Sequence, residues 1–336
     1  MRRQLPESLS RDDSMALKGI AIVLMIMHHV LIKDYYINPD TGLLNNHFIL
    51  RLMVLGKVCV GLFMFVTAYG YAMKPSRDMR YSLSHVMRLL VRYWALLVVF
   101  IALGYYAGNR PQSHIVLLNL VGLSSAYSCA NWYVYFYIYA MIALPLLSWL
   151  VQRYRLWTLL AAVLMCGAAS YLLHRYCSAN MWLTAIRECV FYTPLLAAGC
   201  YLARFGWPFD TRRGLSTIEL LLTLVATLAV GSFSRDIYGF CTFTVLVPVM
   251  AWTMVALLRQ AGASSLRQVL VYLGQLSLYM WFIHAVFFSS MTRSLFQQSA
   301  LWPRNLALVY LLVFSISLVV STILVWLERS VSKKIK

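Results

Sequence analysis

Residues 18–30 read KGIAIVLMIMHHV and decide the fold, because a cation and two imidazoles lie at opposite ends of an apolar helix. A membrane-spanning helix normally excludes Lys and His, so ionisable groups at such depth indicate a functional site. Lys18 and His29 are eleven residues apart. Eleven steps of about 100° place them on one stripe, about 20° apart around the helix and about 16 Å apart along it, whereas His28 points elsewhere. The alternative is that Lys18 only extends to the headgroups and His29 only hydrogen-bonds a neighbouring helix.

The composition extends this interpretation to the whole chain. Hydrophobic residues make up 61% of the sequence and charged residues 12%, and apolar runs of about twenty residues recur, which is the length that crosses a bilayer. We therefore predict an all-α polytopic membrane protein, embedded in the lipid bilayer, with a single domain over residues 1–336. Residues 1–14 are expected to form a cytoplasmic tail, followed by a retained first span rather than a cleaved signal peptide.

Ten spans are predicted, with both termini in the cytoplasm. Residues 114–127 are interrupted by Gly and Ser and are predicted to form an interfacial helix instead. In this topology 20 of the 29 Lys and Arg residues lie on the inner side, including those of the basic tail at 328–336. The net charge of +18 thus follows the positive-inside rule and does not indicate nucleic-acid binding. The predicted spans are residues 15–33, 48–73, 92–108, 131–150, 156–174, 186–204, 215–232, 238–258, 268–289 and 305–327.

The seven cysteines include no CxxC pair and no metal-ligand spacing, so no metal site is expected. Cys129 and Cys177 fall near the predicted outer ends of spans, where an oxidising compartment would permit a disulfide. The sequence alone does not establish their proximity.

Four stretches carry a family resemblance. Residues 18–29 read KGIAIVLMIMHH, in which a basic residue and Gly lead through an apolar run to a His. Residues 60–70 read VGLFMFVTAYG and residues 85–94 read HVMRLLVRYW. The fourth stretch is in two pieces, NWYVYFYIYAMIALP at 131–145 and LGQLSLYMWFIHAVFF at 273–288. Together they resemble the membrane acyltransferase-3 family.

Two positions depart from the family pattern. Lys18 stands where the family usually has Arg, so the charge is kept but the planar fork that grips phosphate or carboxylate is lost. Thr67 and Ala68 stand where the family has Ser and Gly, in a Phe-rich run that is more often core packing than a site. In the last stretch Gly274, Ser277, Tyr279 and His284 match in order.

The resemblance implies a multi-pass enzyme of the bacterial cytoplasmic (inner) membrane. It would move an acyl group, expected to be acetyl, from cytoplasmic acyl-coenzyme A to a hydroxyl of a cell-surface or lipid-linked glycan. Arg88 and Arg92 lie four residues apart on one helical face and would hold the acidic end of this donor, although ordinary positive-inside bias explains either Arg alone.

Acyl transfer needs a base for the hydroxyl proton, and His29 is the best candidate, with Lys18 as its partner. The sequence leaves three roles open for His284: a second acid or base, an oxyanion donor, or a structural hydrogen bonder. Arg187 and Glu188 either orient a His or neutralise each other at the interface, and we favour the second interpretation.

The sequence leaves other points open. Arg51 and Lys57 either extend to the outer headgroups or contact an anionic acceptor or lipid. A transporter of a small solute or anion would also place charged groups inside a bundle. A glycan polymerase is disfavoured, because the longest outer loop is modest. The acceptor sugar, the acyl group and the oligomeric state are not specified.

Overall fold

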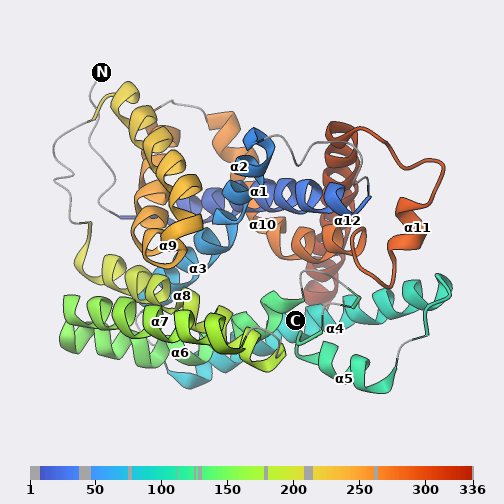
Figure 1. Ribbon diagram of the computed structural model, residues 1–336, viewed down its shortest axis with the longest axis horizontal. Helices are drawn as coiled ribbons and strands as arrows, with labels where there is room; N and C mark the ends of the chain where they lie inside the picture. Colours follow the sequence, from blue (N-terminus) through green and yellow to red (C-terminus); the bar gives the residue numbers. More distant parts are fainter. Residues whose placement is uncertain are drawn as a thin grey trace.

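The computed structural model describes residues 8–37, 47–74, 78–110, 112–124, 126–127, 131–177, 181–207, 215–260 and 264–334. Every regular element that spans several of these residues is a helix (Figure 1). The helices are α1 (Arg11–Ile37), α2 (His47–Gly56), α3 (Val58–Ala72), α4 (Met79–Tyr106), α5 (Ser113–Leu120), α6 (Trp132–Tyr154), α7 (Leu156–Cys177), α8 (Met181–Phe205), α9 (Thr217–Gln260), α10 (Ser264–Val286), α11 (Arg293–Gln297) and α12 (Leu306–Lys334).

The all-helical membrane architecture is confirmed. Among the described residues, seven helical segments are long and apolar enough to cross a membrane, namely α1, the α2–α3 pair, α4, α6, α7, α10 and α12. The three remaining predicted spans fall on α8 and on the two ends of α9. The count of ten crossings and the side of the termini stay predictions.

Helix α9 carries two predicted spans, because it folds back on itself. A straight helix of 44 residues would separate its ends by about 66 Å. Instead, the Thr217 hydroxyl donates to Gln260 Oε1 (3.3 Å), and Gln260 Nε2 donates to the Leu215 carbonyl (2.8 Å). The arms Thr217–Gly231 and Val245–Gln260 are therefore antiparallel neighbours, as Figure 1 shows.

Two sequence-based boundaries were wrong. Helix α4 begins at Met79 rather than near residue 92, because the Asp78 carboxylate accepts from the Tyr81 N–H (2.8 Å) and caps the helix there. The helix expected over 114–127 ends at Leu120. It stops at Gly122, where φ is +78° and a Cβ would lie 2.3 Å from the Asn131 carbonyl oxygen, so that only glycine fits.

Helices α1 and α10 form the central contact, and two glycines let their backbones approach closely. A Cβ on Gly19 would lie 2.0 Å from the Leu270 carbonyl oxygen, and one on Gly274 would lie 2.0 Å from that of Met15. Small residues play this role in membrane helix pairs, where van der Waals packing drives association. The crossing places Lys18, the neighbour of Gly19, beside the start of the 273–288 motif.

The start of α1 is held by a buried carboxylate. Asp13 is 2% exposed and forms a capping box with Ser10: the Ser10 N–H donates to the carboxylate (2.8 Å) and the Asp13 N–H donates to the Ser10 hydroxyl (3.1 Å). The same carboxylate pairs with Arg259 at the end of α9 and with Arg267 near the start of α10 (3.3 Å). The Asp13 carboxylate thus links α1, α9 and α10.

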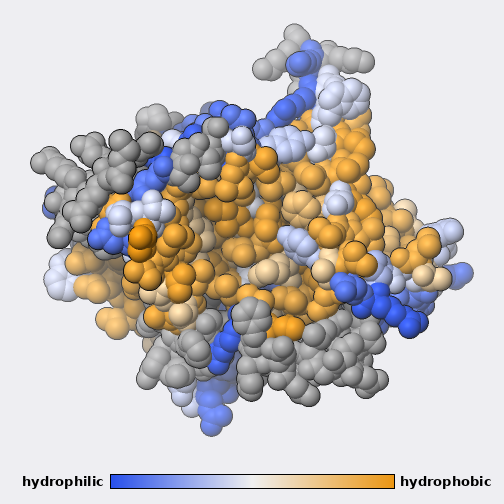
Figure 2. Space-filling model, turned by 90° about the horizontal axis from the view of Figure 1, so that it is seen from above, coloured by the Kyte–Doolittle hydropathy of each residue, from blue (hydrophilic) through white to orange (hydrophobic). Residues whose placement is uncertain are grey.

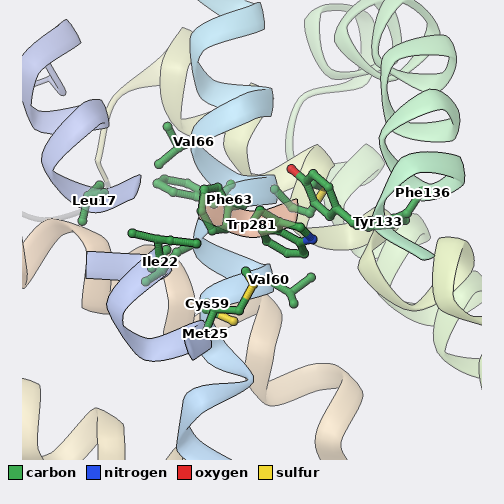
Figure 3. Packing of buried hydrophobic residues seen from close by; sticks show 14 of the residues in the cluster. Leu17, Ile22, Met25, Cys59, Val60, Phe63, Val66, Tyr133, Phe136 and Trp281 are labelled. Carbon is green, nitrogen blue, oxygen red and sulfur yellow. The ribbon is translucent and has the colours of Figure 1, made fainter. Parts of the chain in front are cut away.

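An aromatic cluster fills the centre of the core (Figure 3). Trp281 of α10 packs between Phe63 of α3 and Tyr133 of α6, with ring centroids 5.1 Å and 4.1 Å away. The exterior is also largely apolar: Figure 2 shows hydrophobic side chains over most of one face, with hydrophilic ones mainly at its margins. Exposed Trp157, Leu164 and Tyr171 on α7 belong to such a surface, which is typical of lipid contact.

Candidate functional site

A cavity of about 430 Å³ lies among α1, α3, α4, α6 and α10. All four motif stretches contribute to its wall. The first stretch contributes Lys18, and the second contributes Phe63, Val66, Thr67 and Gly70; the others contribute His85, Arg88, Leu89, Arg92, Tyr133, Tyr137, Met141, Gly274, Gln275, Ser277, Leu278 and Trp281. Segments that are far apart in the chain therefore build one site.

The cavity is strongly basic. Its wall contains the cations Lys18, Lys74, Arg88 and Arg92 together with His85, and none of the described residues that line it is Asp or Glu. Cations that converge on a cavity with low-dielectric walls focus a positive potential and attract anions. Its aromatic wall includes Phe63, Tyr133 and Trp281, the cluster described above. The cavity thus suits a ligand that combines a polyanionic part with an apolar or amide-containing part.

Arg88 is held by the preceding turn of α4. Its Nε donates to the Ser84 carbonyl (3.2 Å), and its Nη2 lies 3.1 Å from each ring nitrogen of His85. His85 in turn hydrogen-bonds the Tyr81 carbonyl through Nδ1 (2.9 Å). This arrangement orients an exposed guanidinium at the cavity wall.

Arg92 is held differently, by a carboxylate on another helix. Its Nε donates to Glu328 Oε1 of α12 (3.0 Å), and the Tyr279 hydroxyl donates to Glu328 Oε2 (2.9 Å). This ion pair joins α4, α10 and α12 at the border of the cavity.

His29 and His284 form a hydrogen-bonded pair. His29 Nδ1 lies 2.8 Å from His284 Nε2, and His284 Nδ1 lies 2.9 Å from the Met280 carbonyl oxygen. A carbonyl can only accept, so His284 Nδ1 carries the hydrogen, and the neutral ring then accepts at Nε2. His29 Nδ1 must be the donor, which leaves the lone pair of a neutral His29 on Nε2. In this tautomer Nε2 is the ring nitrogen of His29 that can accept a proton.

His28 hydrogen-bonds a different helix, although its ring centroid lies 5.4 Å from that of His29. Its Nδ1 lies 2.6 Å from the Met53 carbonyl oxygen of α2, and a Cβ on Gly56 would lie 2.6 Å from the His28 Cβ. The prediction that the two adjacent imidazoles face different directions is confirmed. His28 is buried against α2.

The histidine pair lies just beyond the aromatic part of the basic cavity. Trp281 lines the cavity and precedes His284 by three residues, which is about one helical turn. Lys18 lines the cavity, whereas His29 is not among the residues that line it. The two ends of the α1 stripe therefore have separate surroundings.

Other predicted residues lie elsewhere. Arg187 and Glu188 form an ion pair (2.9 Å), and Arg187 Nη1 also lies 3.2 Å from His174 Nδ1, so the pair neutralises itself and also contacts a histidine. Arg51 in α2 and Lys57 at the α2–α3 junction are half-buried, and neither lines the cavity. Cys129 lies outside the described residues, as does the side chain of Cys177. In the part of the chain that is described, no cluster of three or more His, Cys, Asp or Glu side chains is placed to hold a metal.

Two residues of the site were missed from the sequence. His85 lies one turn before Arg88 on the same face of α4, so the i, i+3 spacing was a usable signal. Glu328 is the only carboxylate within α12. A single acidic residue in a largely apolar helix was also a usable signal. The partners of His85 lie on α4 itself, whereas those of Glu328 come from α4 and α10, which are distant in sequence.

One comparison with known proteins gave a match. A family model described as an acyltransferase domain matches residues 14–326, which is nearly the whole chain. No curated protein and no solved structure matches the chain.

Proposed function

The chain belongs to the membrane acyltransferase-3 family, and from this premise we propose that it is an O-acyltransferase of the bacterial inner membrane. It moves an acyl group, most simply acetyl, from cytoplasmic acyl-coenzyme A to a hydroxyl of a cell-surface or lipid-linked glycan. The observation that carries the proposal is the His29–His284 pair next to a basic cavity with an aromatic wall.

The donor occupies the basic cavity. Coenzyme A carries several phosphates and an amide-containing thiol arm, so it needs cations at one end of its site and a neutral channel for the arm. Arg88 and Arg92 hold the phosphates, with Lys18 and Lys74 on the same wall. The arm lies along Tyr133 and Trp281, which leads the thioester toward His284.

His29 acts as the base. The acceptor hydroxyl gives its proton to His29 Nε2 while its oxygen attacks the thioester carbonyl carbon. The carbon–sulfur bond then breaks, and the coenzyme A thiolate takes the proton from the His29 imidazolium. The products are the O-acylated glycan and coenzyme A, and no covalent acyl-enzyme is needed.

His284 acts through His29 rather than on the substrate. It is fully buried, and its Nδ1–H is held by the Met280 carbonyl (2.9 Å). Its Nε2 accepts from His29 Nδ1, which fixes the ring orientation and the tautomer of the base. His284 is therefore a positioning residue, and of the three roles left open by the sequence this one fits its contacts best.

Ten crossings with both termini in the cytoplasm fit this reaction. In that topology Lys74 and the start of α4 lie on the inner side, so the basic cavity opens where acyl-coenzyme A is found. His29, about 16 Å along α1 from Lys18, then lies toward the outer side, where a surface glycan is reached.

The test compares surface glycans from cells with and without the gene by mass spectrometry. Loss of ester-linked acyl groups on deletion, with restoration by the wild-type gene but not by His29→Ala, is the expected result. The proposal fails if the esters persist in the deletion strain. Uptake of a solute into vesicles without any acyl donor would favour a transporter instead.

A further inference from the structure

A second cavity lies on the other side of the histidine pair. It has a volume of about 510 Å³. Its wall includes Val30 of α1, Val309 of α12, and Trp302 from the segment before α12. Val30 directly follows His29, whereas Lys18, at the other end of the stripe, lines the basic cavity. Along α1 the order is therefore basic cavity, His29, second cavity.

Helix α10 repeats this order independently. Trp281 lines the basic cavity, His284 follows after three residues, and Phe287 follows after three more. The Phe287 ring centroid lies 6.2 Å from that of Trp302, and its carbonyl accepts from Gln297 Nε2 (3.3 Å). Trp302 and Gln297 both line the second cavity. Two helices thus place the histidine pair between the two cavities.

The wall of the second cavity has the chemistry of a carbohydrate site. It presents the amides of Gln297 and Gln298, the hydroxyl of Ser299, the guanidinium of Arg304 and the indole of Trp302. Amides and hydroxyls both donate and accept, as a ring with several hydroxyls requires, and an indole offers a flat apolar face with a polar edge. None of the described residues that line it is Asp or Glu. The remaining lining residues are apolar, namely Val30, Ala300, Pro303, Leu306 and Val309, so the polar groups all come from residues 297–304.

The segment that carries these groups is anchored to Phe287, the residue that directly follows α10. Phe296 packs on Phe287 with ring centroids 4.7 Å apart, and the Trp302 N–H donates to the Ser299 carbonyl (3.0 Å). Residues 297–304 are thereby held over the end of α10 that carries His284. A ligand in this cavity lies on the side of His29 that faces away from the donor.

We propose that this second cavity is the acceptor site, and that residues 297–304 bind a sugar ring so that one hydroxyl reaches His29 Nε2. The inference rests on the proposed function and deepens it by assigning the acceptor to a separate cavity. Trp302 stacks on the ring, and Gln298 and Arg304 bind its hydroxyls or an acidic substituent. The acyl group then passes between the two cavities at the histidine pair.

The test uses the full chain in nanodiscs with radiolabelled acetyl-coenzyme A and glycan purified from a strain that lacks the gene. Trp302→Ala and Gln298→Ala should each raise the glycan concentration for half-maximal rate by about tenfold, the effect of losing about 1.4 kcal/mol of binding. The acetyl-coenzyme A dependence should be unchanged. Leu301→Ala is the matched control, because Leu301 lies in the same segment, is 90% exposed and does not line the cavity.

The outcomes separate the two proposals. If the wild type transfers label and both variants keep its glycan dependence, or change only the donor dependence, the acceptor site is wrong while the acyltransferase proposal stands. If the wild type transfers no label to the glycan, the proposed function itself fails. If Trp302→Ala does not accumulate, Arg304→Ala takes its place in the glycan-dependence measurement. Arg304 is exposed and lines the cavity, and no fold contact depends on its side chain in the described structure.

Discussion

At the scale of single residues, the helical spacing in α1 separates two adjacent histidines into different roles. His29 bonds His284 of α10, and His28 bonds the Met53 carbonyl of α2. His29 is the one of the two that is hydrogen-bonded to a second imidazole. This contact and the spacing from Lys18 both support His29 as the proposed general base.

We predict that His29→Ala abolishes detectable acyl transfer, because loss of a general base typically costs about a hundredfold to ten-thousandfold in rate. His28→Ala should keep most activity per molecule, although the Met53 carbonyl loses its donor, which costs about 1–3 kcal/mol of stability. Transfer rates are compared at equal membrane abundance. Wild-type transfer by His29→Ala would disprove the mechanism even if the fold is right.

Lys18 gives a second prediction. Lys18→Ala should lose activity, because the cavity loses the cation on the α1 wall, whereas Lys18→Arg should keep it, since Arg supplies charge and a fork that binds phosphate. The measurement is the rate of transfer from labelled acyl-coenzyme A. Equal activity of Lys18→Ala and the wild type would show that the cation only extends to the headgroups.

At the scale of helices, the α1–α10 crossing positions both the cation and the histidine pair. Gly19 lies against the backbone of α10, and Gly274 lies against the backbone of α1, so neither position has room for a methyl group. The crossing thus links packing to function, since Lys18, His29 and His284 all lie on these two helices.

Gly19→Ala or Gly274→Ala should destabilise the protein by about 1–3 kcal/mol or more, as overpacking of a tight contact does. A lower thermal denaturation midpoint in detergent is the expected result for both variants. Gly231→Ala is the matched control, because its Cβ would lie 3.5 Å from Leu246 Cδ1, an ordinary contact. Unchanged midpoints for Gly19→Ala and Gly274→Ala would contradict the close crossing.

Helix α4 carries the donor prediction. Arg88→Ala and Arg92→Ala should each raise the acyl-coenzyme A concentration for half-maximal rate about tenfold to a hundredfold, since a hydrogen bond to a charged group contributes about 1.5–3 kcal/mol. The acceptor dependence should change less. Arg80→Ala serves as control, because Arg80 is an exposed α4 residue outside the cavity wall. Normal donor dependence with both arginines replaced would remove them from the site.

At the scale of the whole molecule, two cavities on either side of the histidine pair match a reaction whose donor and acceptor come from opposite sides of a membrane. The apolar exterior and the seven long apolar helical segments place this arrangement within a bilayer. In the predicted topology, which follows from the positive-inside bias, the basic cavity opens toward the cytoplasm.

Reporter fusions test the orientation. A fusion at Lys336 should report the cytoplasm and one in the loop near Pro39 the outside, because 20 of 29 cationic residues then lie on the inner side. A Lys336 fusion that reports the outside, or two fusions that report the same side, would contradict the topology.

The sequence by itself determined most of the helices and the different directions of the two adjacent histidines. The length of the apolar runs predicted where α1, α6, α7, α10 and α12 lie, because a bilayer requires about twenty apolar residues in a helix. The 100° step between residues separated His28 from His29 for the same local reason. Cap geometry at Asp78 and the positive φ at Gly122 shifted two boundaries, since apolar run length does not report caps.

Only the tertiary structure decided which residues meet. His29 and His284 are 255 residues apart and Arg92 and Glu328 are 236 apart, so both pairs depend on how helices cross and in what register. Periodicity gives the face of each helix but not its neighbour. The crossing at Gly19 and Gly274 sets that neighbour for α1, and through it the tautomer of His29 and the position of the histidine pair between the basic cavity and the second cavity.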